Sequence, residues 1–249
     1  MISVRSFLDD YWQGILHLLY PQTCGACGDV LSGGETLFCF SCEAQMPETG
    51  FHRLPQDGHP AFRRFWGRLD TRAIWCSWHM TGEGPVRHLL HALKYRGKPD
   101  LAKACGAYYG EQLIHDGVMK GVDAFTFVPM HPRKESARGF NPAREIASGL
   151  AEASGLPMHS DWLQRLSDKQ LKTRLQSGSQ TQKDRFERWE SVRQLYVPGR
   201  KYSELAGLQS PHVVLVDDVM TTGATLEVCG NLLTEAGATV TLLTLAATG

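Results

Sequence analysis

From about residue 70 onward, apolar segments of two kinds alternate along the chain. Short segments dense in apolar and β-branched residues are typical of strands buried in a sheet. These expected strands are 71–80, 123–130, 211–219 and 238–247. Longer segments repeat apolar residues every three or four positions, as amphipathic helices do. These expected helices are 84–95, 99–115, 141–155 and 224–236. Strand–helix–strand alternation predicts an α/β fold with a mostly parallel sheet and right-handed crossovers.

The ends of two expected helices carry their own signals. Asn141-Pro142 should begin a helix, because asparagine accepts a hydrogen bond from an orphan backbone N–H and proline suits the first turn. Gly155 should end that helix, and Gly237 should end the helix over 224–236.

Residues 1–70 lack this alternation and divide into three parts. Residues 1–20 are amphipathic and carry Asp9 and Asp10, so we expect a helix that packs on its own protein rather than a signal peptide. Residues 21–50 form a small cysteine-rich module. Residues 51–70 contain proline and glycine without a clear period, which predicts a linker or an irregular cover. The alternating region, 71–249, is the expected main domain.

Composition narrows the class of protein. The chain has 249 residues and a net charge of zero, so overall electrostatics favour neither nucleic acid nor membrane as a partner. No segment reaches the ~20 consecutive apolar residues needed to span a bilayer, so membrane insertion is not expected. The charge is uneven, however, because residues 165–201 contain ten Lys/Arg and four Asp/Glu, a local balance of +6.

Four of the seven cysteines form two CxxC pairs separated by eleven residues. The pairs are Cys24/Cys27 and Cys39/Cys42. Each CxxC places two thiolates on one turn, and two such turns can close a tetrahedron around zinc. Four protein ligands leave no open position, so the sequence predicts a structural zinc site in a zinc ribbon. This cysteine usage favours a reducing, cytoplasmic location over a disulfide scaffold.

The strongest chemical signal is VVLVDDVMTTGAT, residues 213–225, where a buried strand ends in two adjacent carboxylates. In a parallel sheet, ligands bind outside the carboxyl ends of the strands. The glycine, the threonine hydroxyls and the free N–H groups of the following helix suit a phosphate. The carboxylates should then meet another part of the ligand, either sugar hydroxyls or a shared Mg²⁺. The acids are Asp217 and Asp218, and the cradle comprises Thr221, Thr222, Gly223, Ala224 and Thr225.

A second half of this site is expected after the strand that ends near Val128. The segment 125–147 supplies a basic loop and then a helix start, which together suit pyrophosphate. The residues of this half are Pro129, Met130, His131, Pro132, Arg133, Lys134 and Arg138.

The motif over 213–225 resembles the phosphoribosyl-pyrophosphate (PRPP) signature of type I phosphoribosyltransferases. The order of the CxxC pairs, LKYRG (93–97), VPMHPRKESARGFN (128–141) and the VDDVMTTGAT block resembles the ComF/GntX family, from about residue 20 to the end. This resemblance implies a type I phosphoribosyltransferase fold behind a zinc ribbon. It also implies that Asp217 and Asp218 meet the ribose diol, that Thr221–Thr225 bind the 5-phosphate, and that the turn over 129–134 binds pyrophosphate. VPMHP is two residues shorter than the loop usual in that family.

The function implied is Mg²⁺-dependent transfer of a phosphoribosyl group from PRPP to a nitrogen acceptor, associated with competence and the use of external DNA. An alternative is a non-catalytic PRPP- or nucleotide-sensing adaptor whose zinc ribbon docks on DNA-processing proteins. A third is a single-stranded DNA-binding protein that uses the basic segment 165–201, with Trp189 and Tyr196 as stacking faces. That segment could instead be a lid over PRPP, with Arg185 as its candidate residue, or a solvated surface.

Overall fold

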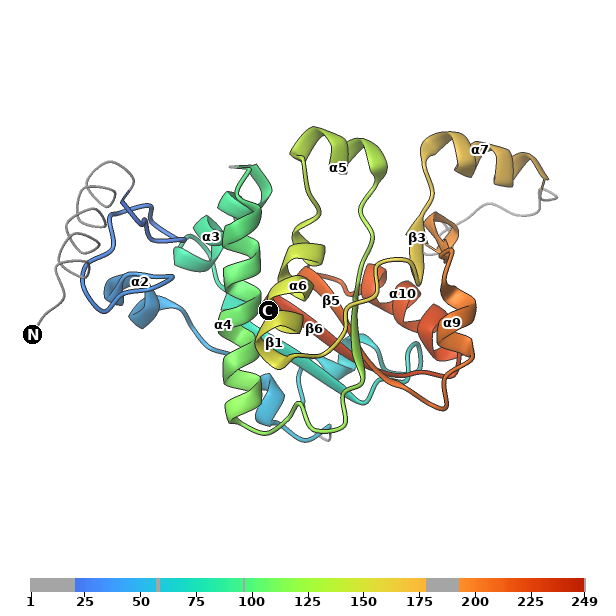
Figure 1. The fold of residues 1–249 in the computed structure, drawn as a ribbon, viewed down its shortest axis with the longest axis horizontal. Helices are drawn as coiled ribbons and strands as arrows, with labels where there is room; N and C mark the ends of the chain where they lie inside the picture. The colour runs from blue at the N-terminus through green and yellow to red at the C-terminus, as the bar shows by residue number, and fades with distance from the viewer. Residues whose placement is uncertain (1–20, 57–58, 96, 178–192, 249) are drawn as a thin grey trace, which may run out of the picture.

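The computed structural model describes residues 21–248 except 57–58, 96 and 178–192 (Figure 1). The expected helix over 1–20 and the candidate lid residue Arg185 lie outside these residues. The main sheet has the strand order β1-β6-β5-β2, and each neighbouring pair is parallel. Its strands are β1 (Ala73–Met80), β2 (Ala124–Phe127), β5 (His212–Met220) and β6 (Thr239–Thr248). The predicted parallel α/β sheet is thus confirmed.

Helices cover the two faces of this sheet, as Figure 1 shows. Val214 packs in a core with α3, α4 and α6, whereas Val213 and Leu215 pack in the opposite core with α10. This alternation follows from the two-residue period of a strand. The four helices are α3 (Pro85–Tyr95), α4 (Pro99–His115), α6 (Pro142–Ser154) and α10 (Ala224–Glu235), and they match the predicted ones closely.

Helices α4 and α6 approach one another at two glycines. A Cβ added to Gly106 would lie 2.1 Å from the carbonyl oxygen of Ile146, and one added to Gly149 would lie 1.9 Å from the carbonyl oxygen of Lys103. Only glycine permits this backbone contact, which holds α6 firmly in place. Since α6 begins beside the carboxyl end of β2, this packing positions one side of the site described below.

The described residues of the segment 51–71 form an irregular cover beside α10 on its face of the sheet. It contains two short 3₁₀ helices, η1 (Phe51–Arg53) and η2 (Phe62–Arg64). Phe51, Phe65 and Leu69 are buried in the same core as α10. The Arg64 guanidinium donates hydrogen bonds to the carbonyls of Met220, Thr221 and Thr248. The cover therefore contacts the carboxyl ends of both β5 and β6.

The cysteine-rich module packs on the opposite core. Its single helix in the described residues, α2 (Phe40–Gln45), begins directly after Cys39 and contains Cys42, so it carries the second CxxC pair. The Phe38 ring lies edge-on to Trp78 of β1, with centroids 5.6 Å apart, and edge-on to Tyr108 of α4. The module thus contributes apolar side chains to the core of the main domain.

The basic segment after β2 was expected to be a loop, and the structure corrects this. Residues Pro132–Arg138 form helix α5. The His131 side chain caps its first turn by accepting a hydrogen bond from the Arg133 N–H, Pro132 takes the first position, and Gly139 ends the helix with φ 87°. These are ordinary capping signals, and the charged composition of the segment obscured them.

Elements of the region between Leu163 and Ala206 were also missed. Strands β3 (Leu163–Arg165) and β4 (Tyr196–Pro198) form a separate antiparallel pair. Helix α7 (Asp168–Ser177) follows β3 in the chain, and helix α9 (Tyr202–Ala206) follows β4. Helices α5 and α7 project on the same side of the molecule (Figure 1). In the part of the chain that the structure describes, no helix combines the length and the apolar character needed to cross a membrane.

Candidate functional site

The carboxyl end of β5 carries the two adjacent carboxylates. Val213–Val216 are fully buried, while Asp217 and Asp218 are partly exposed. The Asp218 backbone N–H donates a hydrogen bond to Asp217 Oδ1 at 2.9 Å. The Lys94 ammonium lies 3.7 Å from Asp218 Oδ2. The pair therefore faces a cleft rather than a set of buried donors.

The electrostatics of this pair are unfavourable without a ligand. Burial raises the pKa of the Asp217 carboxyl well above its usual range, and the neighbouring Asp218 charge raises this pKa further. The hydrogen bond from the Asp218 backbone N–H and the Lys94 charge both lower this pKa, but they do not offset these effects. Two adjacent carboxyl groups at a strand end, one of them with a strongly raised pKa, are typical of a binding or catalytic site.

The connection from β5 to α10 forms a small hollow of about 30 Å³. Gly223 takes a left-handed conformation with φ 80° just before the helix begins at Ala224. The first helical N–H groups have no partner within the helix, and only a long contact of 3.4 Å joins Ala224 N–H to Thr222 Oγ1. These amides and the positive end of the helix dipole favour an anion. The lining residues are Asp217, Val219, Met220, Thr221, Thr222, Gly223, Ala224, Thr225 and Leu226.

The chain leaves β2 at Val128, forms α5, and returns to the sheet at Asn141. The Asn141 amide ties both ends of this excursion together. Its Nδ2 donates to the Val128 carbonyl at 3.0 Å, and its Oδ1 accepts from the Ala143 N–H at 3.1 Å, which caps α6. Asn141 is almost fully buried, so this link is shielded from water.

A cleft of about 340 Å³ lies where the ends of β5 and β2 meet. Parts of both predicted halves of the site line it, with residues from α3, β3 and β4. Thr221, Thr222, Gly223 and Ala224 line only the small hollow. The lining residues are Lys94, Tyr95, Val128, Pro129, Met130, Lys134, Arg138, Asn141, Pro142, Ala143, Arg165, Tyr196, Asp217, Asp218 and Thr225. Four cations therefore surround the carboxylate pair.

Three residues expected in the pyrophosphate half do not line the cleft. His131 Nε2 and the Arg133 guanidinium instead contact the two oxygens of Asp168 on α7, at 3.1 and 3.3 Å. Pro132 begins α5. The sequence placed all basic residues of 129–138 in one loop, but a helix directs its side chains to different sides. Lys134 and Arg138, four residues apart, line the cleft together.

Two cations of the cleft were not among the expected site residues. Lys94 lies in the LKYRG motif, which was noted without a role. Arg165 stands at the start of the basic segment, with its guanidinium carbon 5.5 Å from the centroid of the Tyr196 ring. The Arg165 Nε is buried and has no hydrogen-bond partner among the described residues. A ligand oxygen could provide that partner.

The four CxxC cysteines meet in the cysteine-rich module. All four sulfur atoms lie within 4.8 Å of one another, and Cys27 Sγ is 3.8 Å from Cys39 Sγ. Tetrahedral zinc with Zn–S distances of about 2.3 Å separates its sulfurs by about 3.8 Å. Backbone N–H groups of Asp29 and Cys39 point at Cys27 and Cys24 sulfurs, as in the outer shell of metal sites. The predicted cluster is confirmed, and it can hold a metal ion.

Fold and site define an α/β protein with a parallel sheet, a carboxylate pair at a strand end and a four-cysteine metal-binding module.

No protein-family model matches the chain. It is 27% identical to the DNA utilization protein YhgH of Escherichia coli (strain K12) over 236 residues, which cover 89% of this chain and 94% of that protein. The chain is 28% identical to the YhgH protein of Shigella flexneri over 236 residues, which again cover 89% of this chain and 94% of that protein. It is 30% identical to the YhgH protein of Salmonella typhi over 157 residues, which cover 62% of this chain and 63% of that protein. The chain is a homologue of these proteins, in agreement with the ComF/GntX resemblance.

Proposed function

We propose that the chain binds PRPP and transfers its phosphoribosyl group to a nitrogen acceptor. One observation carries this proposal. The cleft at the ends of β5 and β2 brings the Asp217–Asp218 pair together with Lys94, Lys134 and Arg138. A ligand with neutral hydroxyl groups in its middle and anionic groups at both ends suits such an arrangement, and PRPP is one.

Each part of the ligand has a counterpart in the site. The ribose hydroxyls would donate hydrogen bonds to Asp217 and Asp218. The 5-phosphate would occupy the hollow over Thr221–Thr225, where helix N–H groups point outward. The pyrophosphate would lie toward Lys134 and Arg138, with Arg165 as a further donor.

The reaction needs positioning and charge stabilisation rather than a protein nucleophile. The bond from ribose C1 to the pyrophosphate oxygen breaks, and the electron pair leaves with pyrophosphate. The acceptor nitrogen forms a new bond to C1 and then releases its proton to solvent. Cations already fixed around the leaving group stabilise its growing negative charge without reorganisation.

Metal ions fit both sites in different roles. Mg²⁺ prefers hard oxygen ligands, which the Asp217 and Asp218 carboxylates supply, and when bound with PRPP it would add positive charge near the pyrophosphate. Zinc would be held by Cys24, Cys27 and Cys39 with Cys42, and would stabilise a module too small to fold alone.

The names of the relatives favour a role for this activity in DNA utilisation. Phosphoribosyl transfer to a nucleobase would return bases released from DNA to nucleotides, which is one form such a role could take. A sensor that binds PRPP without turnover would use the same cleft, so turnover has to be measured separately from binding.

Thermal shift with PRPP and ribose 5-phosphate, each with and without Mg²⁺, tests binding. Stabilisation should grow with the excess of ligand over its dissociation constant, by about 2.7 kcal/mol at a hundred-fold excess. ³¹P NMR of PRPP incubated with Mg²⁺ and a panel of nucleobases tests turnover through the appearance of pyrophosphate. Release that depends on one base supports the transferase, and binding without release supports the sensor.

Two variants define the site in these experiments. The double substitution Asp217→Asn with Asp218→Asn should abolish stabilisation by PRPP, because the neutral amides cannot replace two carboxylate acceptors. Glu111→Gln removes an exposed carboxylate on α4 and should change nothing. Full stabilisation of the double variant by PRPP would refute the proposed site.

A further inference from the structure

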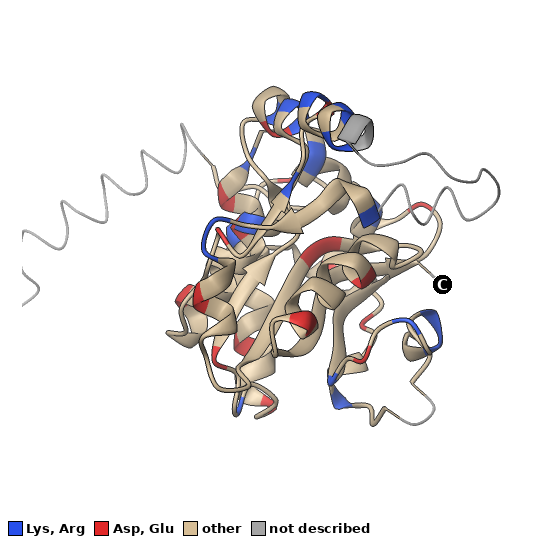
Figure 2. Ribbon diagram, turned by 90° about the vertical axis from the view of Figure 1, so that its right-hand side faces the viewer, with Lys and Arg blue, Asp and Glu red and all other residues tan. Residues whose placement is uncertain are grey.

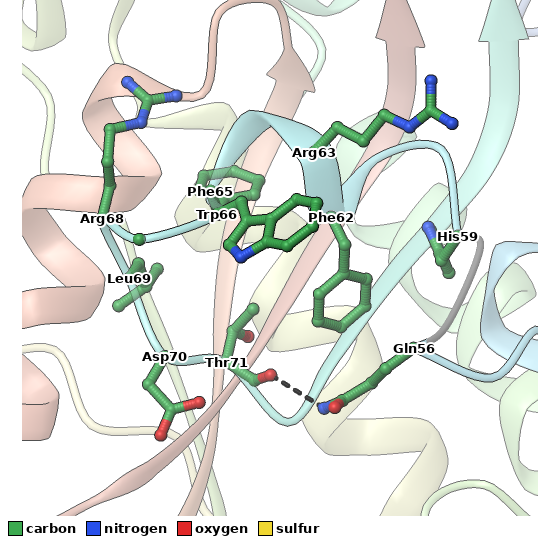
Figure 3. Close-up of a pocket in the computed structure, with 11 residues that line it drawn as sticks. Gln56, His59, Phe62, Arg63, Phe65, Trp66, Arg68, Leu69, Asp70 and Thr71 are labelled. Atoms are coloured by element: carbon green, nitrogen blue, oxygen red, sulfur yellow. Dashed lines mark hydrogen bonds between the residues drawn. The ribbon is translucent and has the colours of Figure 1, made fainter.

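A large groove lies away from the carboxylate pair, in the cover over 51–71. Its volume is about 760 Å³ (Figure 3). Its floor includes the buried side chains of Phe65 and Leu69. The Gln56 amide donates to the carbonyls of Thr71 and Arg72, at 3.0 and 2.6 Å, which holds one wall to the start of β1. The groove is therefore part of the folded surface.

The segment FRRFWGR, residues 62–68, supplies most of the groove and interleaves aromatic and cationic residues. Trp66 is 85% exposed, more than any other large hydrophobic residue in the part of the chain that the structure describes. Phe62 is half-buried beside it. An indole left in water at the mouth of a groove offers a flat face for another ring to stack on.

Two arginines flank this indole. In Figure 3, Arg63 lies on one side of Trp66 and Arg68 on the other, while Asp70 points away. Among the described residues, Arg63 forms no ion pair and is exposed. Arg68 is fixed by the buried Glu227 carboxylate, with Nη1 3.0 Å from Oε2, but its side chain stays 42% exposed. Cations thus stand on both sides of the stacking surface.

The charged surface continues past Gly67 and Arg68. A second cleft of about 530 Å³ shares these two residues and is also lined by Arg174 of α7 and Arg193. Figure 2 shows basic residues both in the cover, at the lower right, and along α7, at the top. A chain of phosphates that passed over Trp66 would therefore meet further arginines beyond it.

We propose that the groove at residues 62–68 binds single-stranded nucleic acid, with a base stacked on Trp66 and the adjoining phosphates on Arg63 and Arg68. Exposed aromatic faces beside a basic track are how proteins hold single strands without sequence preference. A duplex keeps its bases stacked inside, so it cannot use the indole. This site is separate from the Asp217–Asp218 cleft and does not depend on the proposed phosphoribosyl transfer.

Fluorescence anisotropy of a labelled oligothymidylate of about 20 nucleotides, titrated with the full-length protein, tests the proposal. Trp66→Ala should weaken binding roughly 5- to 150-fold, the range expected for one lost base stack. Trp66→Phe keeps an aromatic face and should stay within about three-fold of the parent. Because Trp66 is exposed, both variants should unfold at the parent's temperature.

The charge contribution is measured by the dependence of affinity on salt. Arg63→Gln should lower the slope of log K against log salt by about 0.7, the value for one phosphate contact on a single strand. Arg87→Gln is the matched control. It removes an exposed arginine of α3 that pairs with Glu83, and it should leave the slope unchanged. The same oligonucleotide as a duplex should bind more weakly.

Four outcomes would overturn the proposal. The first three are absence of saturable binding by the parent protein, equal affinity of the Trp66→Ala variant, and Trp66-dependent binding of a proline-rich peptide without binding of the oligonucleotide. The variant with Asp217→Asn and Asp218→Asn should retain the oligonucleotide. A loss there would assign the strand to the other cleft and would likewise exclude the groove.

Discussion

The Phe65 ring occupies the space that a side chain on Gly223 would need. A Cβ built on Gly223 would lie 2.7 Å from Phe65 Cζ and 2.8 Å from Cε1. Gly223 also has φ 80°, a conformation that strains any residue with a Cβ. The irregular cover therefore supports the turn that leads into α10, and Arg64 holds the same turn through the Thr221 carbonyl.

Gly223→Ala should destabilise the fold by about 2–4 kcal/mol, because the left-handed conformation and the contact with Phe65 both oppose the new Cβ. Gly121→Ala is the matched control. Gly121 has the same φ of 80° but no atom within 4 Å of an added Cβ, so this change should cost only about 1 kcal/mol. Urea unfolding measures both, and equal costs would show that Phe65 does not restrict the turn.

Asn141→Ala should cost about 2–4 kcal/mol. It removes the cap of α6 and leaves the buried Val128 carbonyl without its donor. Asn231→Ala removes an amide that donates to the exposed Arg68 carbonyl, and should cost less than about 1 kcal/mol. A small effect of Asn141→Ala on the unfolding midpoint would mean that the 128–141 excursion is held by other contacts.

Asp217→Asn should stabilise the ligand-free protein at pH 8 by about 1 kcal/mol, or roughly 2–4 °C in Tm. The folded-state pKa of Asp217 is raised, so the folded protein binds its proton more tightly than the unfolded chain. Folding is therefore penalised above that raised pKa, and the penalty fades as pH falls through it toward the unfolded value. Tm measured from pH 8 to pH 4 should show the advantage of the variant shrinking. An advantage that grows on acidification would contradict the raised pKa.

Cys39→Ser should remove bound zinc and lower the thermal stability of the cysteine-rich module, because one of four ligands is lost. Elemental analysis of the purified parent should find one zinc per chain. Cys105→Ala alters a buried cysteine of α4 outside the cluster and should keep that ratio. Full zinc content after Cys39→Ser would exclude the four-cysteine site.

Much of the fold could be predicted because its signals are local. Apolar runs of strand length and helical periodicity place the four strands and the helices α3, α4, α6 and α10 within two residues, except that β2 ends at Phe127, three residues before the expected end. Capping chemistry located Asn141 and Gly155 correctly. Helix α5 was missed although His131, Pro132 and Gly139 mark its ends, because its many charges suggested a solvated loop.

The site was only partly predictable for a different reason. Asp217, Asp218 and the turn after them are adjacent in sequence, so a single motif reveals them. Lys94 and Arg165 reach the same cleft from α3 and β3. No sequence spacing links residues that far apart.

By itself, the sequence determined the parallel α/β sheet, the four-cysteine cluster and the acidic strand end, since each depends on periodicity or on neighbours along the chain. Only the tertiary structure decided which cations face the carboxylate pair. Lys134 and Arg138 line the cleft, whereas Arg133 forms an ion pair with Asp168 on α7. The tertiary structure also laid Phe65 against the turn at Gly223 and left Trp66 in solvent. These choices depend on how distant segments pack, and packing is fixed by the shape of the whole core rather than by any local pattern.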